Sequence, residues 1–223
     1  MTLTFRDAMI LIGGVSTPSK MPGYSWSTSA LDCQTGTQLR EKEGSVCSGC
    51  YAMKGNYRFK NVKEAHNRRL EAIKNPRFVE AFCIVLNSLY SKTRKVYEKD
   101  GVEIRENRFR WHDSGDIQSV DHLKMIDEIA LECPHLDFWL PTKESGMLNE
   151  FMKKHEFAPN LNVRLSHPMI GGTFKVKPNG LNFSTVGVKE APNHCPAYNQ
   201  GGKCLSCNNC WNREIVSVNY PKH

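Results

Sequence analysis

No stretch of the sequence is long and apolar enough to cross a membrane: no window in its 223 residues approaches the roughly 20 apolar residues of a membrane span. The only apolar run near the start, Ala8 to Ile12, is too short for a secretory signal peptide. The sequence also lacks internal repeats, low-complexity segments and clear linkers. We therefore expect one cytoplasmic domain with no membrane partner.

The composition is that of an ordinary soluble protein. Apolar residues make up 39% of the chain and charged residues 24%, and the length is sufficient for one domain with a real core. The formal net charge of +7 is compatible with an anionic ligand or a nucleic acid, but it requires neither.

Cysteine is unusually frequent, with nine residues. Seven of them form two groups near the ends of the chain, whereas a secreted disulfide protein is smaller and has its cysteines spread along it. The odd number and the lack of a secretory signal favour metal binding. Cys83 and Cys133 lie in helical patterns, where we expect small core residues. We name Cys33, Cys47 and Cys50 the N-terminal triad, and Cys195, Cys204, Cys207 and Cys210 the C-terminal quartet.

The C-terminal quartet has the spacing C-x2-C-x2-C, with a remote Cys195 followed directly by Pro196. This arrangement is closer to bacterial ferredoxin ligation than to the paired C-x2-C units of zinc ribbons. It favours a four-iron four-sulfur (4Fe-4S) cluster, with a structural zinc site as the alternative. Either metal would help to fold a segment that has little apolar pattern of its own.

The N-terminal triad has too few cysteines to close a tetrahedral zinc site without a fourth ligand. Three cysteines on a 4Fe-4S cluster leave one iron open to an exogenous ligand. Two alternatives stay open: a redox-active C-x2-C pair that leaves Cys33 unused, and a zinc ion shared with a histidine.

The first 55 residues have an irregular pattern, and helical patterns begin after them. We expect Asn61 to cap one helix and Asn75-Pro76 to open a second, whose apolar spacing extends to Val96 and which ends at Asp100-Gly101. Ser119 is the predicted cap of a third helix. A fourth helix is predicted around residues 147–155.

Predicted strands alternate with these helices. They are RFRWH (108–112), DFWL (137–140), NVRLS (162–166), NFSTV (182–186) and IVSVNY (215–220). The alternation predicts an α/β fold with a mostly parallel sheet. Within one domain we distinguish an N-terminal cluster loop (1–60), a βα core (61–190) and a C-terminal cluster segment with the last strand (191–223).

Polar residues follow most of these strands, at the edge where parallel α/β folds gather their sites. His112 and Asp113 end the first strand and are candidates for substrate contact, although a Trp-His pair at a strand end also suits packing. Lys143 and Arg164 are candidates to pair with a carboxylate or phosphate. A solvated side chain is the alternative for Lys143, whereas Arg164 interrupts an apolar strand. His167 is expected to be solvated.

The triad ending in C-x2-C-aromatic, followed by alternating strands and helices, resembles the radical S-adenosylmethionine (SAM) superfamily. Its usual signature is C-x3-C-x2-C, so the gap from Cys33 to Cys47 is longer here. The resemblance implies a partial (βα) barrel with helices outside, a triad-bound 4Fe-4S cluster open to SAM, and an auxiliary 4Fe-4S cluster on the quartet. Ser114, Gly115 and Asp116 would take the part of that superfamily's Gly-Gly-Glu motif, with Asp116 accepting from the SAM amino group. Alternatively, Asp116 stabilises the start of the next helix.

The whole chain also resembles a phage family called gene product eighty-eight. The matching pieces are CSGCYAMKG, RWHDSGDI, NVRLS and CPAYNQGGKCLSCNNCW, which cover most of the chain in the family's order. This resemblance implies a phage or prophage origin, and hence the host cell cytoplasm. It supplies no reaction.

Three functions are compatible with these patterns. The first is a radical SAM-type enzyme with two 4Fe-4S clusters, an electron donor such as flavodoxin or ferredoxin, and a substrate that the sequence does not name. The second is a metal-stabilised nucleic-acid-binding module. Its contact surface would be residues 54–77, where eight Lys or Arg stand against two acidic residues and Tyr57 and Phe59 are interleaved. A solvated basic helix is the alternative for that segment. The third is an electron-transfer protein without SAM.

Overall fold

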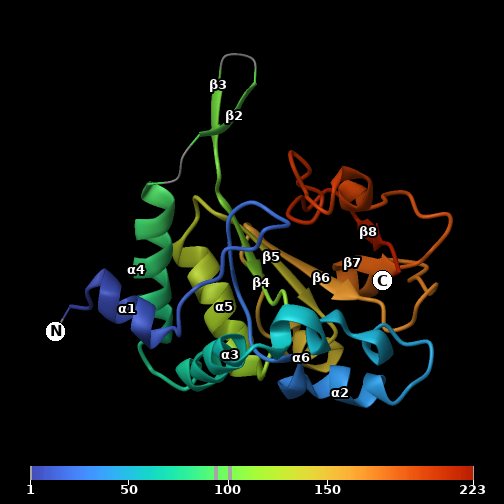
Figure 1. Ribbon diagram of the computed structural model, residues 1–223, viewed down its shortest axis with the longest axis horizontal. Helices are drawn as coiled ribbons and strands as arrows, with labels where there is room; N and C mark the ends of the chain where they lie inside the picture. The colour runs from blue at the N-terminus through green and yellow to red at the C-terminus, as the bar shows by residue number, and fades with distance from the viewer. Residues whose placement is uncertain (1, 93–94, 100–101, 223) are drawn as a thin grey trace.

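The fold is built on a six-stranded sheet in which every neighbouring pair of strands is parallel (Figure 1). The computed structural model describes residues 2–92, 95–99 and 102–222. In spatial order the strands are β1 (Tyr24–Trp26), β4 (Arg108–Trp111), β5 (Asp137–Thr142), β6 (Leu161–Ser166), β7 (Asn182–Val186) and β8 (Ser217–Tyr220). The predicted α/β class with a parallel sheet is confirmed.

The order of the strands in the sheet follows their order in the chain, as in a barrel assembled from successive βα units. In the part of the chain that the structure describes, β1 and β8 are the two edges of this sheet, which is open. A separate antiparallel pair, β2 (Lys95–Lys99) and β3 (Val102–Arg105), extends away from the body of the molecule (Figure 1).

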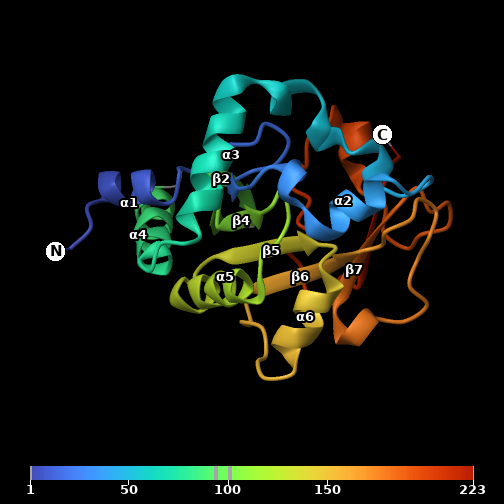
Figure 2. The ribbon, with the colours of Figure 1, turned by 90° about the horizontal axis from the view of Figure 1, so that it is seen from below.

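Helices flank the sheet. They are α1 (Phe5–Leu11), α2 (Gln34–Arg40), α3 (Lys60–Ala72), α4 (Phe78–Ser91), α5 (Val120–Glu132) and α6 (Ser145–Met152). Helix α4 packs against α1 and α5, and α5 packs against α6. Seen from below, α5 and α6 lie on one side of the sheet, and α2 and α3 lie on the other side (Figure 2).

The main hydrophobic core lies on the side of the sheet covered by α4, α5 and α6, which we call the outer face. Successive side chains of a strand point to opposite faces, so Phe109 and Trp111 of β4 both face this core. Their rings pack on Phe82 of α4 at centroid distances of 5.8 and 4.8 Å. Large buried rings of this kind contribute much of the apolar area removed from water.

The opposite side, which we call the inner face, carries residues of different character. The alternate positions Arg110, Trp139 and Arg164 point there, and Trp139 joins a second small core with Cys210 and Trp211 of the C-terminal segment. The sheet is therefore covered by helices on its outer face and by a cysteine-rich segment on part of its inner face.

The predicted helix from residue 76 to residue 100 is too long. Helix α4 ends at Ser91, and Val96 belongs to strand β2, whose backbone pairs with β3. The apolar spacing is helical as far as Tyr90, and after it a short β-branched and aromatic run favours a strand. Asp100-Gly101 lies outside the described residues.

The predicted start of the preceding helix is also displaced. Helix α3 begins at Lys60 after Phe59, so Asn61 is inside the helix and does not cap it. Ser119 does cap α5, because its side chain accepts a hydrogen bond from the backbone N–H of His122. The first 55 residues are less irregular than predicted, since they contain α1, α2 and β1.

We predict that Gly115→Ala destabilises the fold by about 2–4 kcal/mol. Gly115 has φ +72°, and a Cβ there would lie 2.7 Å from the backbone oxygen of Thr28. Urea unfolding measures the change. Gly146→Ala in α6 is the matched control, because open space surrounds that position, and it should change stability by less than about 1 kcal/mol. Equal effects of the two substitutions would contradict the prediction.

Candidate functional site

The N-terminal triad lies on short turns around α2. Cys33 immediately precedes α2, Cys47 opens a 3-10 turn (Cys47–Gly49), and Cys50 follows that turn. A Cβ at Gly36 would lie 3.5 Å from the Cys33 sulfur and 3.7 Å from the Cys47 sulfur, so both sulfurs lie beside this glycine. Burial, followed by nearby charges that include Cys50 and Cys47, raises the pKa of Cys33. The structure therefore brings the three cysteines together.

Among the residues that the structure describes, no group of three His, Cys, Asp or Glu side chains is placed to hold a metal ion. This finding concerns single-ion sites. In a 4Fe-4S cluster each cysteine binds a different iron.

The triad faces the carboxyl ends of β4 and β5. The Asp116 charge contributes to the raised pKa of both Cys33 and Cys47, for which burial is the largest cause, and the Lys143 charge opposes the shift at Cys47. Two predicted cofactor-binding residues, Asp116 and Lys143, thus lie beside the triad. They come from the segments that follow two adjacent strands, as the strand-end argument predicts.

Asp116 is held by three hydrogen bonds. Its Oδ1 accepts from the Ile117 N–H (2.8 Å) and from the Thr142 hydroxyl (2.6 Å), and its Oδ2 accepts from the Lys143 N–H (2.9 Å). Burial raises its pKa to about 6, although these hydrogen bonds lower it. The carboxylate ties the turn after β4 to the end of β5 and still has one acceptor position on Oδ2.

Glu144 fixes the start of α2, and sequence reasoning missed it. Its carboxylate accepts from the Thr35 N–H (3.0 Å) and from the Thr35 hydroxyl (2.7 Å), two residues after Cys33. Only 4% of Glu144 is exposed. The only sequence signal for Glu144 was its position just after a strand. Its hydrogen bond to the backbone of Thr35 joins residues far apart in the chain, and no local sequence pattern predicts such a contact.

Asp113 and Ser114 are occupied by contacts within the chain. Asp113 accepts from the Tyr57 hydroxyl at 3.3 Å, and its carbonyl accepts from the Tyr51 hydroxyl. The Ser114 hydroxyl donates to the Thr28 carbonyl at 2.7 Å. The bonds from Tyr51 and Tyr57 attach the segment after Cys50 to the turn after β4, and the Ser114 bond attaches the segment before Cys33 to the same turn.

His112, predicted to contact substrate, lies in the core and not with the triad. Its ring packs against Trp26 and Trp111, and it faces His122 at a centroid distance of 5.6 Å. Only 3% of His112 is exposed. These surroundings match the alternative prediction, in which the Trp-His pair at the strand end packs in the interior.

The C-terminal quartet gathers over the inner face. Cys195, Cys204 and Cys210 border the same small core, and the charges of Cys195 and Cys207 both act on Cys204. Burial raises the pKa of Cys210 to about 11, and the Tyr220 hydroxyl lies 3.1 Å from its sulfur. The backbone amide of Cys204 donates to Lys20, and that of Cys195 donates to Asn219.

Arg164, predicted as a site residue that pairs with a carboxylate or phosphate, is fully buried beneath this segment. Its guanidinium donates to six backbone carbonyls, of which five belong to residues 209–216 and one to Phe183. Within the described residues no carboxylate forms an ion pair with it. A buried cation without an anionic partner fits an anionic metal–thiolate group at the quartet.

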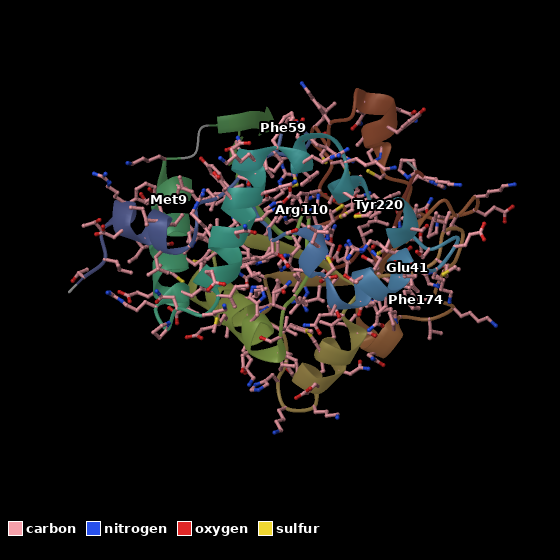
Figure 3. The ribbon with its side chains drawn as sticks, turned by 60° about the horizontal axis from the view of Figure 1, so that its bottom comes forward. Met9, Glu41, Phe59, Arg110, Phe174 and Tyr220 are labelled. Atoms are coloured by element: carbon pink, nitrogen blue, oxygen red, sulfur yellow. The ribbon has the colours of Figure 1, made fainter. Side chains whose placement is uncertain are left out.

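Arg110 lies between the two cysteine groups. Its charge acts on Cys204 and Cys210 of the quartet, and also on Tyr51, which follows Cys50 of the triad. Figure 3 shows the labelled Arg110 and Tyr220 near the centre of the molecule, among sulfur atoms drawn in yellow. Sequence reasoning missed Arg110 because RFRWH is read only as a strand.

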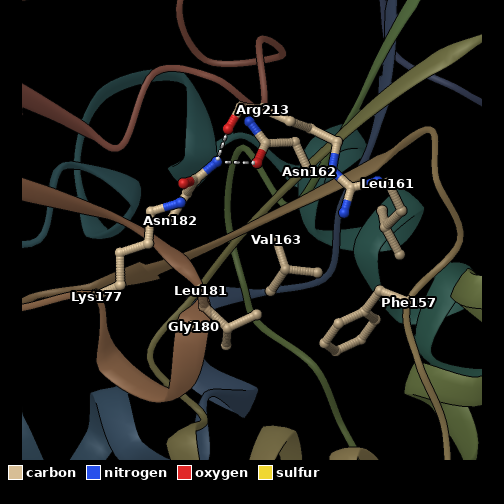
Figure 4. Close-up of a pocket in the computed structure, with 9 residues that line it drawn as sticks. All are labelled: Phe157, Leu161, Asn162, Val163, Lys177, Gly180, Leu181, Asn182 and Arg213. Carbon is tan, nitrogen blue, oxygen red and sulfur yellow. Dashed lines mark hydrogen bonds between the residues drawn. The ribbon is translucent and has the colours of Figure 1, made fainter.

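A pocket with a volume of about 100 Å³ opens at the other end of the strands (Figure 4). It is lined by the first residues of β6 and β7, among them Leu161 and Asn182, and by Arg213. The Asn182 side chain donates to the Arg213 carbonyl at 2.8 Å. This pocket lies away from the triad, which faces the carboxyl ends of the strands.

The basic segment 54–77 is partly used inside the fold. Arg69 is 4% exposed and donates to the carbonyls of Gly14 and Ser27, while the Tyr57 hydroxyl is bonded to Asp113. Phe59 is 58% exposed. Two of the residues proposed for a nucleic-acid surface therefore have structural contacts.

A family model described as Gene product 88 matches residues 10–213, in agreement with the resemblance of the sequence motifs. No curated protein and no solved structure gives a match. Within residues 2–92, 95–99 and 102–222, no helix has the length and apolar character that crossing a bilayer requires.

We predict that His122 makes the protein less stable in mild acid. Burial lowers the pKa of His122 to about 3, whereas an unfolded histidine has a pKa of about 6.5. The unfolded state therefore takes up a proton that the folded state does not, and stability falls as the pH decreases below 6.5. Between pH 7.5 and 5.5 the loss is about 1.4 kcal/mol. Urea unfolding of His122→Gln should show a pH dependence smaller by this amount; an unchanged pH dependence would refute the prediction.

We predict that Arg164→Met destabilises the protein by about 3 kcal/mol or more, because buried carbonyls lose their donors. Arg77→Gln is the control, since Arg77 belongs to an ion pair with Glu80 in which the side chains are 39% and 46% exposed, and it should cost less than about 1 kcal/mol. Urea unfolding measures both. If Arg164→Met lost as little stability as the control, Arg164 would not be holding residues 209–216 on the sheet.

Proposed function

The chain belongs to the gene product 88 family, and we propose that it is an iron–sulfur enzyme of the radical SAM type. One observation carries the proposal: two cysteine groups from opposite ends of the chain lie along one parallel sheet, with Arg110 between them. Three cysteines would leave one iron of a 4Fe-4S cluster open, and four would complete the ligands of an auxiliary cluster.

Cys33, Cys47 and Cys50 would hold the first 4Fe-4S cluster, and Cys195, Cys204, Cys207 and Cys210 the second. A reduced cluster held there would give one electron to SAM, which would break a carbon–sulfur bond and yield methionine and a 5'-deoxyadenosyl radical. An electron donor such as flavodoxin or ferredoxin would supply the electron. The chain's own contribution is to position the ligands and to exclude water.

Asp116 has a binding role in this proposal. The free acceptor position on its Oδ2 would receive the SAM ammonium in a charge-assisted hydrogen bond. Thr142 and the Lys143 amide hold the carboxylate in place through its other acceptor positions. The Glu144–Thr35 hydrogen bonds keep the first cysteine of the triad at the same edge of the sheet.

Anaerobic purification should give a brown protein with about eight iron and eight sulfide per chain. Substituting Cys47 or Cys207 by alanine should each remove about four iron, because each residue belongs to a different group. Cys83→Ala is the matched control and should keep all iron, since Cys83 packs on the core. Stoichiometric zinc without sulfide would contradict the proposal.

SAM should perturb the electron paramagnetic resonance spectrum of the reduced protein, and 5'-deoxyadenosine should form. Asp116→Asn should weaken the SAM effect while iron content stays unchanged. If the iron-loaded protein shows no change in its spectrum with SAM and forms no 5'-deoxyadenosine, it would be an electron-transfer protein. Zinc content together with strongly salt-dependent DNA or RNA binding would favour the nucleic-acid-binding module.

A further inference from the structure

Arg110 presents a hydrogen-bond donor, its Nε, that has no partner in the described part of the chain. Its guanidinium stacks over the Trp139 ring at 4.3 Å from the centroid. Stacking covers one face of the planar group and leaves its edge to donate. Its terminal nitrogens are partly engaged: Arg110 hydrogen-bonds the Tyr51 side chain, and one terminal nitrogen lies 3.4 Å from the His112 carbonyl.

Two buried donors at this position have no partner in the described part of the chain: Arg110 Nε and Trp139 Nε1. Trp139 is only 5% exposed. Buried N–H groups are normally hydrogen-bonded, so two unpaired donors on stacked side chains indicate that a ligand completes the site.

Arg110 also lacks a close ion-pair partner within the described residues. Asp113 is a nearby acid, but Ser25 and Tyr57 bond its two oxygens. Burial lowers the pKa of Arg110, while Tyr51, Asp113 and Tyr220 raise it by more, so the group stays charged.

Arg164 provides an internal contrast. It lies on the same face but is fully buried, whereas Arg110 is half-buried, and backbone carbonyls accept from all of the Arg164 nitrogens. Arg164 is therefore part of the scaffold, whereas Arg110 keeps a buried Nε without a partner among the described residues. Both side chains come from the sheet, which is a rigid base for a binding site.

We infer that Arg110, stacked on Trp139, binds an anionic group of the substrate, a carboxylate or a phosphate, between the two cysteine groups. The planar guanidinium suits either group because it donates two parallel hydrogen bonds. The inference rests on the proposed function only in calling this ligand the substrate; the anion site itself depends on the geometry of Arg110 and Trp139.

Calorimetric titration of the iron-loaded protein tests the site, with inorganic phosphate and malonate as probes at constant ionic strength. At least one probe should bind, and tighter binding of phosphate or of malonate identifies the group. Arg110→Gln should weaken binding about tenfold or more, because charged hydrogen bonds are lost. Lys124→Gln removes one positive charge from an exposed ion pair on α5 and should leave binding unchanged.

The site is overturned if neither probe binds to iron-loaded protein, or if Arg110→Gln binds as well as the original protein. Should Arg110→Gln fail to fold or to load iron, Arg110→Lys decides, since it keeps the charge but loses the planar fork. Binding about tenfold weaker in Arg110→Lys supports the site, and unchanged binding overturns it. If SAM chemistry fails but a probe still binds through Arg110, the enzyme proposal falls and the anion site stands.

Discussion

The placement of the C-terminal quartet depends on the Arg164 guanidinium. The segment that carries these cysteines has few apolar residues, so hydrophobic burial alone would not hold it on the sheet. Arg164 donates to carbonyls along residues 209–216, and Arg108 adds a hydrogen bond to the Cys207 carbonyl. Because the donors come from strands, the rigidity of the sheet is transmitted to an irregular loop.

The N-terminal triad is attached by the same means but with acceptors in place of donors. Glu144 accepts from Thr35, and Asp113 accepts from Tyr57. Each cysteine group is thus fastened to the sheet by polar side chains of residues that lie on or just after its strands. The sheet acts as a common frame that sets the separation between the two groups.

The sequence predicted the strands of the sheet well, because hydrophobic periodicity and the polar residues that follow a strand are local signals. All five predicted strands exist, as does the Ser119 cap. The missed helix α1 had a readable signal, the capping box of Thr4 and Asp7. The roles of Glu144, Arg110 and Arg164 could not be read, because each depends on partners distant in the chain. The burial of His112 among aromatic rings could not be predicted either, because tertiary packing sets the direction of a side chain whose backbone has a positive φ.

The crossover between β7 and β8 has a consequence for folding. In a βα unit this connection would be a helix on the outer face, but here it is residues 187–216, which contain the whole quartet. Pairing β8 with β7 closes this irregular connection, which lies across the inner face. The final pairing is therefore a step of high loop entropy, and any ligand that orders residues 187–216 shortens the search by which the last strand finds its edge.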